Sequence, residues 1–396
     1  MRVLMVHSRY RQRGGEDVAV DAEIAALRAA GVDVVPFFGD NNILTDKSAI
    51  AAGLHALWST QTLQQLRHLI AETAPDVMHV HNTFPGLSAS AYTATQGRRI
   101  PIVQTLHNFR LFCSNALLLR EGEPCTRCLG AALPWRGIQF ACYRESHAAS
   151  AIVAAQSMIH RLLGARQVAR YIALSQSSRE LFIAGGLPAE RIAVKPNIIP
   201  DPGPDSSPDR SNAAAGSPAA APRQGLLFVG RLSPEKGLDT VLAALHGMDV
   251  PLTVAGDGPQ AAALQAASPP HVRWLGAVPP AEISRLMRQA ALLVFPSRAF
   301  ENYPMALAEA MAHGLPVLAS DRGAMREMLQ PGHTGWLVPP GDAVAWRDAI
   351  TDLLRRPQDL AAAGQAARAH YLAHLAPARM VQRQLDIYQT AIGAAT

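Results

Sequence analysis

The stretch SRAFENYPMALAEAMAHGLPVLAS, residues 297–320, holds the most informative pattern in this 396-residue chain. Glu301 and Glu309 stand eight positions apart, and Pro304 lies where a helix could begin, because proline fixes φ and needs no N–H in the first turn. A helix start presents unpaired N–H groups and partial positive charge, which suit a phosphate. Carboxylates accept the hydrogen bonds that sugar and ribose hydroxyls donate. The pattern therefore predicts that two acids flank a phosphorylated, hydroxyl-rich ligand at a helix start.

A second motif, FVGRLSPEKG at residues 228–237, predicts a cationic loop after a strand. The strand should end near Gly230, and Arg231 and Lys236 follow on a turn before the next helix. Arginine offers a fork of donors and lysine a mobile point charge, and both suit a pyrophosphate. Fixed cations there would stabilise the negative charge that grows on a departing diphosphate.

Around these motifs, short apolar runs alternate with helical patterns, which predicts an α/β protein with parallel, doubly wound sheets. In the first half we expect helices at 16–30, 60–73, 86–96, 148–164 and 178–185, and strands at 2–7, 33–38, 77–81, 101–106, 171–174 and 192–195. In the second half we expect a last helix at 377–393, and strands at 225–230, 252–255, 271–275, 291–295, 315–319 and 335–338. Residues 200–223 are rich in Pro, Ser, Ala and Gly, which predicts a flexible linker.

With these motifs, the chain closely resembles the retaining glycosyltransferases of family 4 over nearly its whole length. The resemblance implies the GT-B fold, in which two Rossmann-like domains enclose an inter-domain cleft. It implies an acceptor-binding domain at 1–199, with a cysteine-rich insertion at about 110–145, and a nucleotide-sugar-binding domain at 224–376. Residues 377–396 would form a C-terminal helix that packs back on the first domain.

The resemblance also implies roles for the two motifs. Arg231 and Lys236 would hold the donor diphosphate, Glu301 would contact hydroxyls of the transferred sugar, and Glu309 would accept from the ribose. The loop and helix start formed by Asn302, Tyr303, Pro304 and Met305 would also contact the donor. These contacts would come chiefly from backbone N–H groups, and Pro304 has no N–H. Many members have Gly-Phe-Gly where this chain has Asn-Tyr-Pro, so the identity of the donor stays open.

The first half adds candidates of its own. Gly14 and Gly15, within RGGED at 13–17, resemble the family's first loop and would let backbone N–H groups approach the ligand closely. His107, in TLHNFR at 105–110, ends a strand, and the resemblance places it beside the reacting sugar, where it would donate to a hydroxyl or handle charge. His79 and His81 alternate in direction along a strand, so at most one of them faces a cleft.

The function that the resemblance implies is retaining transfer of a hexose from a UDP- or GDP-sugar to a saccharide or lipid-linked acceptor, in cell-surface polysaccharide biosynthesis. The chain has no Asp-x-Asp pair to hold a divalent cation, which favours a metal-independent reaction without a catalytic cofactor. Two alternatives stay open. One is a nucleotide-sugar 2-epimerase of the same fold, and the other is a non-catalytic partner in a polysaccharide assembly complex.

The four cysteines, Cys113, Cys125, Cys128 and Cys142, all lie in the expected insertion. The chain begins like a β-strand and not like a signal peptide, so we expect a reducing, cytoplasmic location in which disulfides are disfavoured. Four thiolates around a central Cys-x2-Cys suit a structural zinc ion. The alternative is four reduced, partly buried thiols.

The formal net charge is +5, and residues 98–170 hold ten Arg against three Glu. Such a basic region attracts an anionic membrane surface or phosphate-bearing acceptors, or it merely aids solubility. The apolar segment at 146–170 fits either a helix lying on a membrane or a core helix. We therefore expect a cytoplasmic protein, free or peripheral on the inner face of the cell membrane, with no nucleic acid among its partners.

Overall fold

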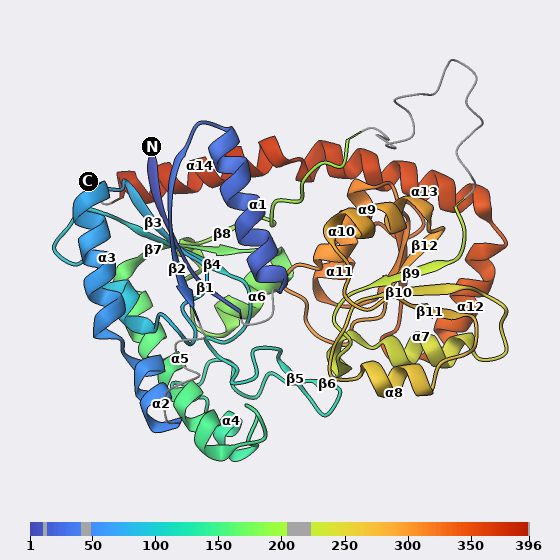
Figure 1. Ribbon diagram of the computed structural model, residues 1–396, viewed down its shortest axis with the longest axis horizontal. Helices are drawn as coiled ribbons and strands as arrows, with labels where there is room; N and C mark the ends of the chain where they lie inside the picture. The colour runs from blue at the N-terminus through green and yellow to red at the C-terminus, as the bar shows by residue number, and fades with distance from the viewer. Residues whose placement is uncertain (11–13, 41–48, 204–222, 395–396) are drawn as a thin grey trace. The chain divides into compact units, whose positions relative to one another are not determined.

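The computed structural model describes residues 1–10, 14–40, 49–203 and 223–394 (Figure 1). The chain divides into two compact units, one formed by Met1–Ile198 with Pro377–Thr396 and the other by Ile199–Ala376. Each unit contains one six-stranded parallel sheet with helices packed against it (Figure 1). The prediction of two doubly wound α/β sheets is confirmed. Most of the predicted linker, 200–223, lies outside the described residues.

The sheet of the first unit has the strand order β2-β1-β3-β4-β7-β8, and every pairing is parallel. Its central strands β1, β3 and β4 are almost wholly buried, as expected where helices cover both faces of a parallel sheet. The strands are β1 (Arg2–Arg9), β2 (Asp33–Asp40), β3 (Val77–Val80), β4 (Ile102–Leu106), β7 (Val168–Ala173) and β8 (Ile192–Val194).

The helices of the first unit include one from the far end of the chain. The last helix, α14, packs on α1, and its Met380 and Tyr388 join Val3 and Val77 in one buried core. The helices are α1 (Gly15–Ala29), α2 (Ala49–Leu57), α3 (Thr60–Thr73), α4 (Trp135–Gln139), α5 (His147–Gln167), α6 (Gln176–Ala184) and α14 (Pro377–Gly393), with the short 3₁₀ turns η2 (Ala89–Thr93) and η3 (Ala189–Arg191).

The prediction of a helix at 86–96 is wrong. This segment forms turns around η2, whose residues are all buried. The Ser88 hydroxyl accepts from the Ser90 N–H, and the Thr93 hydroxyl donates to the Ser90 carbonyl. Such local bonds from Ser and Thr compete with the α-helical pattern, and they explain why apolar spacing alone misled here.

The cysteine-rich insertion contains the two-stranded hairpin of β5 (Leu119–Arg120) and β6 (Glu123–Pro124), followed by α4. The next helix, α5, buries Val153 and Ala154 against the unit, whereas Met158 and Leu162 are exposed. No helix in the described part of the chain is both long and apolar enough to cross a membrane.

The sheet of the second unit has the order β11-β10-β9-β12-β13-β14, again parallel throughout. Phe228 and Trp346 lie at the centre of its core. The strands are β9 (Leu226–Val229), β10 (Leu252–Ala255), β11 (Val272–Trp274), β12 (Leu292–Phe295), β13 (Val317–Ser320) and β14 (Gly335–Val338). The helices are α7 (Leu238–Leu245), α8 (Ala261–Ala266), α9 (Pro280–Gln289), α10 (Met305–Ala312), α11 (Gly323–Met328), α12 (Ala343–Leu354) and α13 (Pro357–His370), with the 3₁₀ turn η5 (Pro234–Lys236) and the π-helical turn η6 (Tyr371–Leu375).

The strand orders show where ligands should bind. In a doubly wound sheet, ligands occupy the carboxyl edge at the point where the strand order reverses. That point falls between β1 and β3 in the first sheet and between β9 and β12 in the second. The loops that follow these four strands are therefore the first places to look for a site.

Candidate functional site

Both predicted motifs of the second half follow strands at this reversal point. The loop after β9 carries Lys236, the loop after β12 carries Glu301, and the Lys236 Nζ lies 2.7 Å from the Glu301 Oε1. The Ser297 hydroxyl donates to the same carboxylate oxygen at 2.6 Å. The side chains of Lys236 and Glu301 are 25 % and 13 % exposed to solvent, so a ligand can reach them.

Glycines allow these loops to pack backbone against backbone. Gly237 has φ +67°, and a Cβ there would lie 2.2 Å from the Pro296 carbonyl oxygen. A Cβ on Gly256 would lie 1.9 Å from the Gly230 carbonyl oxygen. A side chain at Gly237 or Gly256 would push the loops apart, so the glycines do more here than allow turns.

Helix α10 begins after Pro304 as expected, and the loop just before it carries buried polar atoms without a hydrogen-bond partner. The Asn302 Oδ1 and the Tyr303 hydroxyl are buried and have no hydrogen-bond partner within the described residues. Buried polar atoms of this kind are rare in native proteins unless water or a ligand pairs with them. Arg231, from the β9 loop, is exposed, and its predicted contact with a diphosphate stays a prediction.

Glu309 lies one turn inside α10, where burial raises the pKa of its carboxyl group to about 7. The carboxyl is therefore partly protonated at neutral pH, unlike an ordinary glutamate. Its protonation state would change within the physiological range, and with it the number of hydrogen bonds that it can accept.

We expect Glu309 to make the stability of the second unit fall as the pH rises. The native pKa is raised above the ordinary 4.5, so the folded unit holds a proton that the unfolded chain releases. The free energy of unfolding should fall by roughly 3 kcal/mol as the pH rises from about 4.5 to above 7. Urea unfolding at pH 5 and pH 8 measures this. In Glu309→Gln this part of the pH dependence should vanish, and an unchanged slope would contradict the assignment.

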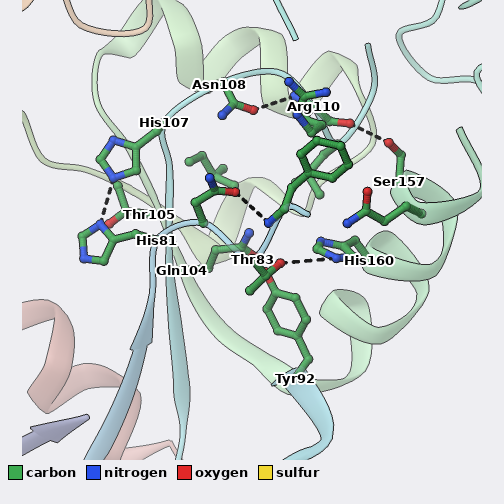
Figure 2. Close-up of a pocket in the computed structure, with 15 residues that line it drawn as sticks. His81, Thr83, Tyr92, Gln104, Thr105, His107, Asn108, Arg110, Ser157 and His160 are labelled. Atoms are coloured by element: carbon green, nitrogen blue, oxygen red, sulfur yellow. Dashed lines mark hydrogen bonds between the residues drawn. The ribbon is translucent and has the colours of Figure 1, made fainter. Parts of the chain in front are cut away.

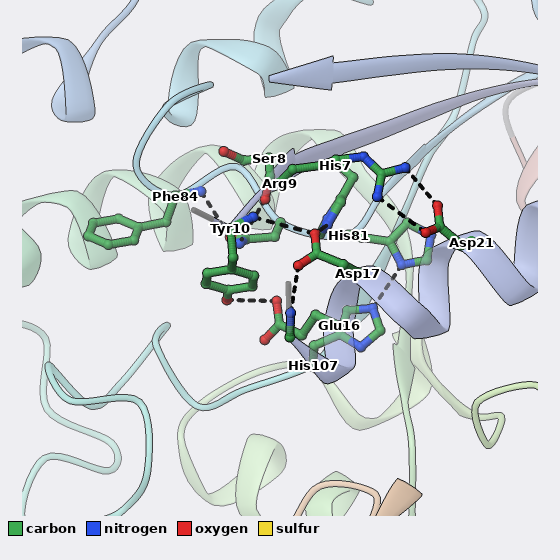
Figure 3. Close-up of polar contacts among 12 residues, drawn as sticks. His7, Ser8, Arg9, Tyr10, Glu16, Asp17, Asp21, His81, Phe84 and His107 are labelled. Carbon is green, nitrogen blue, oxygen red and sulfur yellow. Dashed lines mark hydrogen bonds and ion pairs between the residues drawn. The ribbon is translucent and has the colours of Figure 1, made fainter. Parts of the chain in front are cut away.

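In the first unit, the start of α1 is an acidic hydrogen-bonded cluster (Figure 3). The Asp17 carboxylate accepts from the Gly14 N–H at 2.9 Å and bonds the buried His7 Nε2 at 2.9 Å. The Tyr10 hydroxyl donates to Glu16 at 2.8 Å. The Gly14 N–H is thus already engaged, whereas a Cβ at Gly15 would meet no atom within 4 Å. The predicted backbone approach to a ligand therefore rests mainly on Gly15.

His107 lies in a cavity at the carboxyl edge of the first sheet, next to His81 (Figure 2). The His81 Nδ1 and the His107 Nε2 are 2.8 Å apart, so one ring donates to the other. Burial lowers the pKa of His107 to about 4 and lowers that of His81 well below its ordinary value. Both rings are thus neutral near pH 7, which favours a hydrogen-bonding role for His107 over charge handling.

The prediction that His79 and His81 point in different directions is wrong. Residues two apart on a strand share a face, and the two ring centroids lie 4.1 Å apart. His79 is fully buried. Its Nδ1 lies 2.7 Å from the Tyr388 hydroxyl and 3.2 Å from the Glu23 carboxylate. Glu23, His79 and His81 place their ligand atoms within 4.8 Å of one another, a spacing compatible with a metal ion. However, the Lys195 Nζ lies 2.6 Å from the Glu23 Oε2 and already supplies the positive charge. This cluster fits a buried ionic network better than a metal site.

The four cysteines line one shared cavity and form no disulfide. Burial raises the pKa of Cys113, Cys128 and Cys142, and the neighbouring thiols add to this in Cys128 and Cys142. Among the described residues, no three of the four sulfurs lie within 4.8 Å of one another. Zinc binding therefore requires the side chains to move together, and it stays a prediction.

Metal analysis tests the zinc prediction. If the four thiolates bind zinc, the purified full-length chain should carry about one equivalent, because a tetrahedral thiolate site holds the ion tightly. Cys125→Ser/Cys128→Ser should lose it, whereas Glu23→Gln should not. A zinc content well below one per chain in the unsubstituted protein rejects the site.

The structure adds residues that sequence reasoning missed. Ser297 lies inside the opening stretch, and its position four residues before Glu301 was the available signal. His7 lies near the carboxyl end of β1, so the rule that ligands gather at carboxyl edges could have found it. Gln156, which lines the His107 cavity, lies in an apolar helix and gave no signal.

Comparison with known proteins agrees with the two-unit fold. The family model described as "Glycosyl transferase 4-like domain" matches residues 14–198, and "Glycosyl transferases group 1" matches residues 210–370. The crystal structure of Anabaena Alr3699/HepE in complex with UDP superposes with a TM-score of 0.67 at 19 % identity, covering 98 % of this chain and 100 % of that one. The two parallel α/β units therefore define a GT-B fold.

Curated relatives match part of the chain. The phosphatidyl-myo-inositol mannosyltransferase of Mycobacterium leprae (strain TN) is 39 % identical over 164 residues, 38 % of this chain and 44 % of that protein. The GDP-mannose-dependent alpha-mannosyltransferase of Mycobacterium tuberculosis (strain CDC 1551 / Oshkosh) is 35 % identical over 139 residues, 35 % of this chain and 36 % of that protein. These matches span less than half the length of either relative. Together with the two family models, these matches show that the chain belongs to family 4 of the glycosyltransferases.

Proposed function

We propose that this chain is a retaining glycosyltransferase that moves a hexose from a UDP- or GDP-sugar to a saccharide or lipid-linked acceptor. The observation that carries the proposal is the Lys236–Glu301 pair, which joins the loops after β9 and β12 at the reversal point of the second sheet. Lys236, with Arg231, neutralises the departing diphosphate, and Glu301 orients the transferred sugar through its hydroxyls. No step needs a metal ion, because fixed cations and the start of α10 supply the positive charge.

The relatives support the choice of donors and acceptors. One relative is named for GDP-mannose and another for phosphatidyl-myo-inositol, and the structural neighbour was solved with UDP. A lipid-linked acceptor also fits the first unit, where neighbouring helices α2, α4 and α5 expose Leu54, Trp135 and Leu162. Such side chains suit contact with a membrane surface. We therefore place the reaction at the inner face of the cell membrane, in the assembly of a cell-surface polysaccharide.

A thermal-shift screen with UDP, GDP, UDP-glucose and GDP-mannose tests the donor assignment. A ligand that binds only the native state raises the melting temperature, and the rise grows with the logarithm of its concentration above its Kd. We expect one nucleotide class to stabilise the wild-type chain, and to stabilise Lys236→Ala much less. If none of the four shifts the melting temperature, the proposed function fails. Assays with and without acceptor then separate transfer from 2-epimerisation, which consumes donor alone.

A further inference from the structure

The cavity beside His107 holds a buried amide without a partner. Gln156, in the middle of α5, is 2 % exposed and lines this cavity. Neither its Oε1 nor its Nε2 has a hydrogen-bond partner among the described residues. A buried side-chain amide with both ends unpaired is unusual, because the large majority of buried polar atoms are satisfied. A ligand that both donates and accepts at this point would satisfy it.

The other polar groups around Gln156 are mostly neutral (Figure 2). His160, one turn further along α5, has its pKa lowered to about 4 by burial, and its Nε2 lies 3.4 Å from the Thr83 hydroxyl. Arg110 is the one Lys, Arg, Asp or Glu among the described residues that line the cavity. Its guanidinium is 4.5 Å from the Phe84 ring centroid and donates to the Ser114 carbonyl at 3.1 Å.

This combination selects for hydroxyl groups. A hydroxyl both donates and accepts, so two adjacent hydroxyls can pair with the amide oxygen and the amide nitrogen of one glutamine. An apolar ligand would leave Gln156 unpaired, and a multiply charged ligand would meet only one cation. The Phe84 and Tyr92 rings that also line the cavity offer apolar surface for the flat face of a ring.

We propose that this cavity binds a hydroxyl-bearing ring of the acceptor, and that Gln156 pairs with two of its adjacent hydroxyls. The inference rests on the proposed function and deepens it, because it gives the acceptor a chemical class and a place in the first unit. Gln156 acts as a substrate-binding residue that selects the acceptor. It takes no part in holding the donor diphosphate, whose proposed side-chain contacts, Arg231 and Lys236, come from the second unit.

The test uses the full-length chain and two ring probes, methyl α-D-mannopyranoside for a pyranose and myo-inositol for a cyclitol. Saturation-transfer NMR titrations should show saturable binding of at least one probe, and the stronger one identifies the ring type. Gln156→Met, which keeps the side-chain length and removes both polar atoms, should weaken that binding at least tenfold. Gln167→Met, near the end of the same helix and outside the cavity lining, should leave it unchanged.

A purely structural glutamine would behave differently. If Gln156 only bridges buried water, the methionine variant should lose thermal stability and retain its probe affinity. If it binds the ring, the variant should be as stable as wild type or more so, because an unpaired amide has been removed. Gln156→Leu serves as a second variant should methionine disturb the fold. No saturable binding by wild type, or equal affinity in wild type and variant, overturns the proposal.

Failure of the proposed function would show another pattern. Nucleotides would then fail to stabilise the wild-type chain, while the ring probes would still depend on Gln156. Conversely, the chain could bind nucleotide normally and bind neither ring probe. In that case the proposed donor site stands and this acceptor pocket is rejected.

Discussion

Glu301→Gln should lower the rate of sugar transfer roughly 100-fold or more, in line with the loss of one preorganised electrostatic contact in other enzymes. Glutamine keeps the size of the side chain but loses its charge. The Lys236 ammonium, held at 2.7 Å by this carboxylate, would then lose the group that orients it toward the diphosphate. Lys236→Ala should cost as much, because the cation itself is gone. Initial rates at several donor concentrations measure kcat and kcat/KM for both variants.

A matched substitution distinguishes a specific effect from a general one. Glu282 pairs with Arg285 on the exposed surface of α9, in the same unit. Glu282→Gln should leave the transfer rate within about twofold of wild type, because exposed ion pairs contribute little. Circular dichroism and melting temperature confirm that each variant is folded. Near wild-type rates in both Glu301→Gln and Lys236→Ala would mean that the active site lies elsewhere.

Lys195→Met should destabilise the first unit by roughly 3–5 kcal/mol, the usual cost of removing one partner of a buried ion pair. Lys195 and Glu23 are both almost fully buried and lie 172 positions apart in the sequence. Burial alone would raise the pKa of Glu23, but Lys195 and His79 outweigh it and hold the pKa well below its ordinary value. Without Lys195, the carboxylate stays buried next to two neutral imidazoles.

Calorimetry on the full chain measures this loss as a fall of roughly 10 °C in the transition of the first unit. Glu23→Leu/Lys195→Met removes both charges and should recover much of the stability, since apolar replacements of buried pairs are often neutral. Asp33→Asn breaks the exposed Arg2–Asp33 pair and should cost less than about 1 kcal/mol. A loss in Lys195→Met no larger than in Asp33→Asn would show that the buried network contributes little.

The sequence was a good guide to elements with strong periodicity. The last helix was expected at 377–393 and forms over Pro377–Gly393, because its apolar positions repeat at helical spacing. The strands are close to their expected positions, since parallel strands buried on both faces read as continuous apolar runs. The prediction of a helix at 86–96 is wrong because the Ser and Thr side chains of this segment form local hydrogen bonds, which the spacing of apolar residues does not reveal.

For the site, local motifs could be recognised in the sequence, but pairings between residues far apart in the chain could not be predicted from it. Lys236 and Glu301 were both singled out, and the structure brings them into contact. The pairing of Lys195 with Glu23 depends on the order of strands in the sheet, which no short pattern encodes. Gln156 looks like an ordinary polar position in a helix, and only its burial in the folded unit makes it notable.

The position of α14 has a consequence for how the protein is made. The ribosome finishes residues 1–198 first, yet Met380 and Tyr388, which complete the core of that unit, emerge only after the whole of 199–376. Until α14 is synthesised, part of the apolar surface of the first unit and His79 therefore stay exposed, whereas the second unit can already fold completely. We expect chaperones to engage the early chain during this interval, and a stop codon at position 377 to leave an aggregating product.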